Sequence, residues 1–169
     1  MEVKFGSNKH EVLKELKILG RNCYQRMHKT FNELVLEGYI TTDKKVTQKG
    51  LDKIANIEKD KNWSEKGLVN AVASPTGGYS SYIYKIRAIE LGLIYIDNRD
   101  VFIITEKGKR WLKERAINVL QKYKLDIWII VDLMPYVEDI SILPGYLTSD
   151  YDFIRDPAKK RFDELKGES

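Results

Sequence analysis

The chain has 169 residues, of which 43% are hydrophobic and 32% are charged, and its net charge is +4. This composition excludes wholesale disorder and provides apolar residues for one large domain or two small ones. The longest apolar run, residues 127–131, is too short to span a membrane, and the N-terminus shows no apolar signal region. A single cysteine, Cys23, excludes an internal disulfide, so we expect a cytoplasmic protein that is not inserted in a membrane.

Positive charge is concentrated in the first three quarters of the chain. Residues 1–62 carry a net charge of +4, residues 63–124 carry +5, and residues 125–169 carry −5. This asymmetry favours a polyanionic partner, such as nucleic acid, for the basic part. The alternative is that the excess of lysine and arginine only solvates the surface.

The first 61 residues show the pattern of three helices and a short hairpin. Ser7 is a candidate N-cap for the first helix, and a second helix extends from about Asn22 to Gly38. The segments YITT and KVT, separated by the turn DKK, predict two short strands. A third helix follows from Gln48, with apolar residues three positions apart.

The same order of elements repeats between residues 62 and 118. Asn62 or Ser64 can cap a helix, SPTGG predicts a turn, and YSSYIYKIRAIEL predicts the next helix, which ends at Gly92. LIYI and VFIIT, joined by the polar turn DNRD, predict a hairpin. A long helix begins with EKGKRWL.

The residues that repeat are LVLEGYI followed by VTQKG, and IELGLIYI followed by ITEKG. This pattern resembles the second half of a winged helix-turn-helix domain, as in DNA-binding regulators of the MarR and PadR types. The resemblance covers residues 7–118 and implies a mainly α fold with small β-hairpins (α+β). It implies two tandem winged helix-turn-helix units, residues 1–61 and 62–118, followed by a C-terminal helical segment, residues 119–169. The first unit departs from the pattern because little chain precedes Ser7 to form the usual first helix.

The helix expected over residues 22–37 has one apolar and one polar face. The apolar face carries Cys23, Met27, Phe31 and Leu34. The polar face supplies the candidate DNA-binding residues Asn22, Gln25, Arg26, His28, Lys29 and Asn32. Amides can bond adenine bidentately in the major groove, and the cations reach guanine or phosphate. The alternative is an ordinary solvated helix face, although such faces usually contain more glutamate.

The second unit and the two hairpin tips supply further candidates. Its second helix is expected to bury Tyr79, Ile83, Ile86 and Ile89. Its outer face would then present Ser80, Ser81, Tyr84, Lys85 and Arg87, with hydroxyls at the helix start that suit phosphate. At the hairpin tips, Lys44, Lys45 and Arg99 are positioned to contact the DNA backbone, as the family resemblance implies.

The C-terminal segment has a different character. Residues 125–143 combine apolar side chains on all sides with acids, which indicates a buried position. If the helix that starts at Glu106 continues to Met134, this end requires a partner, and the resemblance suggests a homodimer interface. The alternative is that the segment folds back on its own two units. Asp156 and Pro157 are expected to start a short final helix.

No constellation of catalytic residues is present in the sequence. The two histidines, His10 and His28, lack metal-ligand spacing, and one cysteine cannot form a zinc site. A glycine-rich phosphate loop is also missing. The acids Asp150, Asp152 and Asp156 before Glu164 resemble a nuclease core only faintly, since the segment is too short for that fold. We therefore expect a protein without enzymatic activity, metal or cofactor.

Three functions are compatible with these features. The first is a dimeric transcriptional regulator that binds duplex DNA through the 22–37 helix and the hairpin tips. The second is a tandem winged-helix scaffold that binds proteins, as in endosomal sorting or chromosome condensation complexes. The third is a DNA-handling accessory resembling a plasmid or virus replication initiator.

Replacing Arg26 and Lys29 together by alanine is predicted to weaken duplex binding by at least about tenfold at low salt, because each substitution removes a cation that can reach the DNA. Fluorescence anisotropy with a labelled duplex measures this change. Unchanged binding by the double variant would show that the 22–37 helix does not recognise the DNA.

Overall fold

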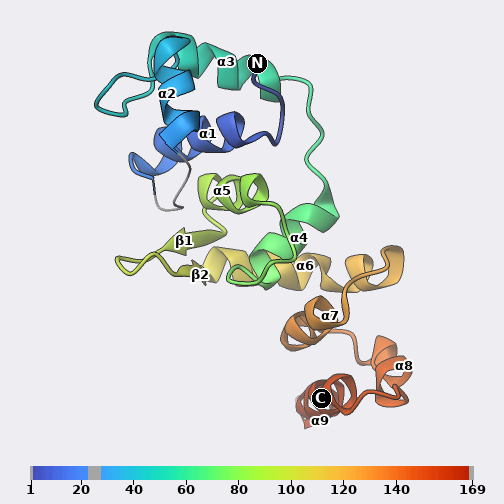
Figure 1. The fold of residues 1–169 in the computed structure, drawn as a ribbon. Coiled ribbons are helices and arrows are strands. Elements are labelled where there is room, and N and C mark those ends of the chain that lie inside the picture. The colour runs from blue at the N-terminus through green and yellow to red at the C-terminus, as the bar shows by residue number, and fades with distance from the viewer. Residues whose placement is uncertain (1, 23–27, 168–169) are drawn as a thin grey trace.

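The computed structural model describes residues 2–22 and 28–167 and shows a mainly helical chain arranged in three successive tiers (Figure 1). The first tier contains α1 (Asn8–Leu19), α2 (His28–Leu36) and α3 (Gln48–Glu58). The middle tier contains α4 (Glu65–Ala73), α5 (Tyr82–Glu90), β1 (Ile94–Ile96), β2 (Phe102–Ile104) and α6 (Glu106–Lys122). The last contains α7 (Ile127–Leu133), η1 (Met134–Tyr136), η2 (Ile140–Ile142), α8 (Pro144–Leu147) and α9 (Asp152–Gly167). The expectation of a mainly α fold with a small amount of β structure is thereby confirmed.

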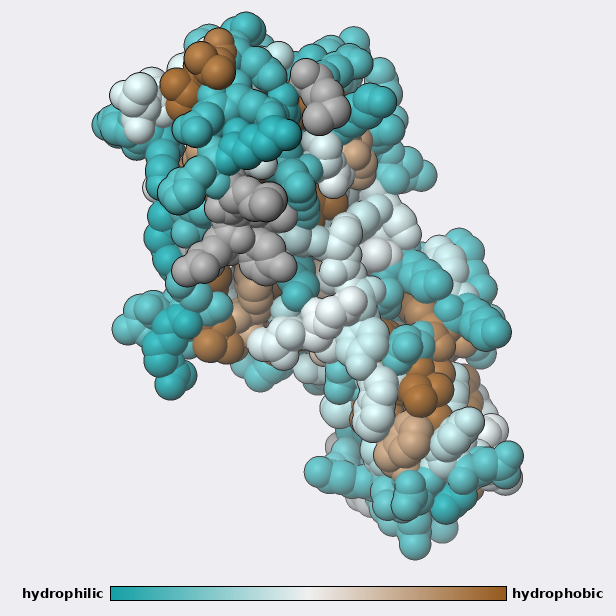
Figure 2. Space-filling model, in the orientation of Figure 1, coloured by the Kyte–Doolittle hydropathy of each residue, from teal (hydrophilic) through white to brown (hydrophobic). Residues whose placement is uncertain are grey.

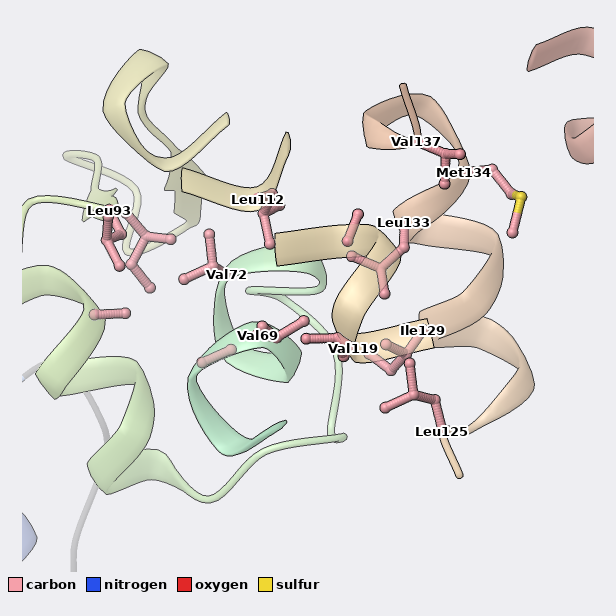
Figure 3. Close-up of a cluster of buried hydrophobic side chains, with 14 of the residues drawn as sticks. Val69, Val72, Leu93, Leu112, Val119, Leu125, Ile129, Leu133, Met134 and Val137 are labelled. Carbon is pink, nitrogen blue, oxygen red and sulfur yellow. The ribbon is translucent and has the colours of Figure 1, made fainter. Parts of the chain in front are cut away.

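Two hydrophobic clusters form the core: one lies within the first tier, and the other joins the middle and last tiers. The first contains buried side chains of the N-terminal segment, of α1 to α3 and of the α2–α3 connection: Val3, Val12, Leu13, Leu16, Phe31, Leu34, Ile40 and Ile54. The second extends from α4 through α6 to α9, and Figure 3 shows side chains from α4, α6 and α7 meeting in it. The second unit and the C-terminal segment therefore share one core.

The glycine and threonine of each repeat have the same structural roles. Gly38 and Gly92 end α2 and α5 in the left-handed region, with φ of 78° and 73°. Residues of L configuration with a side chain rarely adopt this conformation, so glycine suits both positions. Thr47 and Thr105 cap α3 and α6, since each hydroxyl accepts a hydrogen bond from the N–H three residues later, at 3.1 and 2.9 Å. Each hydroxyl also donates to the carbonyl of the preceding glycine, at 2.6 and 2.7 Å.

The lysine of each repeat closes the same turn. Lys49 Nζ donates to the carbonyl of Glu37 at 2.6 Å, and Lys107 Nζ donates to the carbonyl of Leu91 at 2.8 Å. Both carbonyls belong to the end of a helix, where four such groups lack a partner within the helix. The Thr-x-Lys-Gly motif therefore fixes how each helix start meets the preceding helix end.

In each repeat, a connection links the turn glycine to the capping threonine, and the two connections differ in length. β1 and β2 pair antiparallel, with Ile94 opposite Ile104 and Ile96 opposite Phe102, as predicted. The strands predicted around residues 39–47 are wrong, because a single bridge, between Ile40 and Val46, replaces the hairpin. The capping threonine follows the turn glycine by nine residues in the first repeat and by thirteen in the second. The shorter connection leaves room for one bridging pair.

The C-terminal segment is divided into shorter helices than its apolar pattern suggests. A continuous helix from Glu106 to Met134 is wrong, because Tyr123 is extended and Asp126 caps a new helix by accepting a hydrogen bond from the N–H of Trp128 at 2.9 Å. The final helix does not start at Asp156 and Pro157. It starts at Asp152, and Pro157 lies inside it. The Tyr151 carbonyl accepts hydrogen bonds from residues 154 and 155, so the helix is already formed before the proline.

The apolar side chains of the C-terminal segment are buried within the chain. Leu125, Ile129, Leu133 and Met134 belong to the second cluster, on which α4 and α6 also pack. The segment therefore folds back on the second unit, which was the alternative to a dimer interface. A homodimer stays a prediction. Within the described residues, none of the helices has the length and apolar character needed to cross a membrane.

The repeated turns predict a matched pair of destabilising substitutions. A Cβ on Gly50 would overlap the carbonyl oxygen of Tyr39, and a Cβ on Gly108 would overlap that of Leu93. We expect Gly50→Ala and Gly108→Ala each to lower the free energy of unfolding by about 2 kcal/mol or more, because backbone must move. Urea denaturation measures the loss. Gly145→Ala is the control, because its Cβ would meet no atom within 4 Å, and an equal loss there would contradict the explanation.

Candidate nucleic-acid interface

α2 divides into a buried and an exposed face in the part that the structure describes. Phe31 and Leu34 are buried in the first cluster, whereas His28, Lys29 and Asn32 are exposed. The Lys29 side chain is 79% exposed, and its ammonium lies 3.9 Å from the Glu33 carboxylate. These three candidates therefore share one solvent-facing side. The candidates Gln25 and Arg26 lie outside the described residues, and Asn22, just before them, is half-buried.

The first connection places two cations beside α2. Lys44 has a φ of 64° at the tip, and its ammonium lies 4.8 Å from the centre of the Phe31 ring. Lys45 is 79% exposed and lies 3.6 Å from the Asp43 carboxylate. A hydrogen bond from the Thr41 hydroxyl is the main reason why the pKa of Asp43 is lowered, with the charge of Lys45 contributing. Both lysines are thus exposed at the edge of the α2 surface.

The second hairpin carries Arg99 on a turn that is fixed by backbone hydrogen bonds. Asp97 accepts from the N–H groups of Val101 and Arg99, at 3.0 and 2.8 Å, and the Val101 bond is the main reason why the Asp97 pKa is lowered. The Arg99 side chain is 81% exposed. Arg21 follows Gly20, the C-cap of α1, and its guanidinium lies 2.5 Å from the Asp100 carboxylate at the hairpin tip. This ion pair connects the hairpin of the second unit to the first unit.

Both connections project toward the same side of the molecule, on the left in Figure 1. Figure 2 shows mostly hydrophilic surface over the first tier, interrupted by a hydrophobic patch, and hydrophilic surface over the tip of the β1–β2 hairpin, while hydrophobic surface also gathers over α7. Lys45 and Arg99 are therefore exposed on two connections that project toward the same side.

The candidates on α5 are in a different environment, because α5 packs between α1 and α4. Ser81 is exposed at the N-cap, and Ser80 is half-buried. Tyr84 accepts a hydrogen bond from the Ser64 N–H at 3.0 Å, and its ring would lie 2.7 Å from a Cβ on Gly67. The tyrosine is thus fitted against the start of α4.

The two basic candidates on α5 are bound within the chain. Lys85 Nζ donates to the Gly77 carbonyl at 2.8 Å and lies 5.3 Å from the centre of the Phe102 ring, and burial lowers its pKa. Arg87 pairs with Glu90 and lies 5.2 Å from the centre of the Trp63 ring. The burial predicted for Ile83 and Ile86 is confirmed, whereas Tyr79 is 37% exposed. Tyr79 precedes the helix and its N-cap, so the helical periodicity does not apply to it.

A buried charged cluster joins the two units and was not predicted. Lys14 on α1 has no exposed side-chain surface and lies 2.7 Å from Glu58 on α3 and 3.2 Å from Glu90 on α5. His10 is equally buried and lies 2.9 Å from Glu58. The spacing of four residues between His10 and Lys14 places them on one face of α1, which is the signal that the sequence offered.

Hydrogen bonds connect the members of the cluster. His10 Nδ1 accepts from the Gly6 N–H at 3.0 Å, and its Nε2 lies 2.9 Å from the Glu58 carboxylate. Burial is the largest influence on Glu58 and raises its pKa, but the bonds from His10 and Lys14 together outweigh it and lower the pKa. Glu58 is therefore an ionised carboxylate between an imidazole and an ammonium.

This arrangement places exposed polar and charged side chains on α2 and on the two connections. In residues 2–22 and 28–167, no three histidine, cysteine or acidic side chains are grouped so that they could hold a metal ion. No family model, curated protein or solved structure matches the chain.

Glu58→Gln is expected to lower the free energy of unfolding by about 3–5 kcal/mol at neutral pH, because it leaves the buried Lys14 ammonium without its main counter-charge. The folded-state pKa of Glu58 is below its ordinary value of 4.5. Its stabilising effect is therefore complete above that pH and disappears as the pH falls through the folded-state pKa. Urea denaturation at pH 7 and at lower pH should show the two proteins converging in acid.

Glu106→Gln is the matched control for this substitution. Glu106 is 79% exposed and pairs with Lys109 at 2.9 Å on the surface of α6. Its removal should leave stability nearly unchanged. An equal loss in both variants, or a constant difference between wild type and Glu58→Gln down to pH 3, would contradict a stabilising role for the buried cluster.

Proposed function

We propose that the protein binds duplex DNA as a transcriptional regulator, with α2 in the major groove and the two connections on the flanking backbone. The observation that carries this proposal is the exposure of Lys29 on α2 and of Lys45 and Arg99 on the two connections. In this proposal, the two repeats are tandem winged helix-turn-helix units. The shared Thr-x-Lys-Gly geometry supports that interpretation, because both units join a helix end to the next helix start by the same hydrogen bonds.

The exposed cations are available for phosphate because their present ion pairs are weak. Lys29, Lys45 and Arg99 each lie 3.6–3.9 Å from a neighbouring carboxylate on the surface. Such pairs contribute about 0–1 kcal/mol, so a phosphate can replace the carboxylate at little cost. Binding that depends on these cations releases counterions and weakens as salt increases.

The two repeats contribute unequally to the proposed interface. α5 occupies the position in the second repeat that α2 has in the first, but α1 and α4 cover it. Lys85 and Arg87 are engaged with Gly77 and Glu90. We therefore assign base reading to the 22–37 helix and backbone binding to the β1–β2 hairpin, whose tip contacts the first unit through the Arg21–Asp100 ion pair.

A protein-binding scaffold is the second candidate. It is favoured by the exposure of large aromatic side chains in the last tier, where Trp128 and Tyr151 are 46% and 54% exposed. Both rings lie close to Phe153, which stacks on Trp128 at 4.7 Å. A scaffold would show no salt-dependent affinity for duplex DNA, so one binding experiment separates the two candidates.

Replacing Lys44 and Lys45 together by alanine is expected to weaken binding to a labelled 30-base-pair duplex by about tenfold at low salt. The slope of log K against log salt should also decrease by about one for each phosphate that the variant no longer neutralises. Fluorescence anisotropy at several salt concentrations measures both quantities.

The control replaces Lys159 and Lys160, two exposed lysines on α9 in the last tier, by alanine. This variant has the same net charge as the first. Equal weakening by both variants would show that binding follows overall charge and not the proposed surface. Wild-type protein that does not bind duplex DNA even at low salt would exclude the proposed function.

A further inference from the structure

A pocket of about 610 Å³ lies where the C-terminal segment meets the second unit. Its walls come from the end of α4, from α7 and η1, and from α9. Much of the lining is apolar and includes Val131, Met134 and Pro157. The volume is within the range of about 300–1,000 Å³ that is typical of small-molecule sites.

The Asp132 carboxylate in this pocket has no counter-charge among the described residues. Asp132 on α7 is half-buried, and the described residues form no ion pair with it within 4 Å. Burial is the main influence on Asp132 and raises its pKa, while a hydrogen bond with the Ser74 hydroxyl opposes this shift. A neutral hydroxyl stabilises the carboxylate only in part, because the charge itself is not compensated.

The arginine that lines the same pocket is already engaged. Arg161 Nε donates to the Val137 carbonyl at 2.7 Å, and its Nη1 lies 3.1 Å from Glu164. Its side chain is 13% exposed, so these bonds hold it in the wall. Lys160 lies exposed at the rim together with Asp156. The wall therefore combines three carboxylates with two cations, and Asp132 is the carboxylate set deepest among apolar groups.

We infer that this pocket binds a small organic ammonium ion, with its charge against the Asp132 carboxylate and its hydrocarbon part against Val131 and Met134. An ammonium group restores the missing counter-charge and hydrogen bonds to a carboxylate more strongly than a neutral donor does. The hydrocarbon part gains from leaving water, by an amount that grows with each buried CH₂. An organic anion of the same size would meet Asp132 without compensation. This inference does not depend on DNA binding.

The test uses the full chain and two probes of equal size and opposite charge, n-butylammonium chloride and sodium butyrate. Amide chemical shifts in a ¹⁵N-labelled sample are followed during titration at pH 7 and constant ionic strength. We expect n-butylammonium to shift the resonances of residues 131–136 and of α9 saturably, and butyrate to leave them unchanged. Equal responses to both probes, or shifts scattered over surface carboxylates, would overturn the inference.

Two variants locate the charge that is recognised. Asp132→Asn should weaken n-butylammonium binding by about tenfold, since the amide has no charge. Asp156→Asn, at the exposed rim, should change it by less than about twofold. Unchanged affinity in Asp132→Asn would overturn the assignment. Should Asp132→Asn not fold, the contrast between the two probes in wild-type protein decides the question alone.

Discussion

The burial of α1 between two sets of helices is the constraint on which the arrangement of the chain depends. On one side, Leu13 and Leu16 fill the first hydrophobic cluster. On the other, Lys14 reaches across to Glu90 on α5 while it remains bonded to Glu58 on α3. Charged groups in such a position are stable only when their partners stay in place, because an unpaired buried charge is costly. The cluster therefore fixes how the two units meet, and it also explains why α5 is covered.

The local turns determine what the two units present to solvent. Each turn glycine reverses the chain after a helix, and each capping threonine starts the next helix at a fixed distance from it. Only the connection between them varies, and the longer one forms a paired hairpin that reaches Arg21 in the first unit. A rigid repeated turn with a variable tip is a suitable base for a binding surface, since the tip can change without disturbing the core.

Much of the fold could be predicted from local signals, while the relation between its parts could not. The caps at Ser7 and Ser64 and the turns at Gly38 and Gly92 are local, and the structure confirms them. Polar periodicity assigns Lys85 to solvent, yet the Gly77 carbonyl and the Phe102 ring engage it. The burial of Lys14 was not predicted, because its partners Glu58 and Glu90 belong to helices far along the chain. The exposed side of α2 was predictable because its apolar stripe is narrow. The tail pocket was not, because its walls come from three separate segments.

The covering of α5 has a consequence for the symmetry of any DNA target. Under the proposed function, one chain offers a single groove-reading helix, although it contains two copies of the repeat. It would occupy one asymmetric half-site, with the second hairpin extending the footprint along the backbone to one side. A palindromic operator would require two chains related by a twofold axis, and the distance between its half-sites would be set by the interface between chains. Under the proposed function, the internal duplication would therefore lengthen the footprint of a monomer without making it self-symmetric.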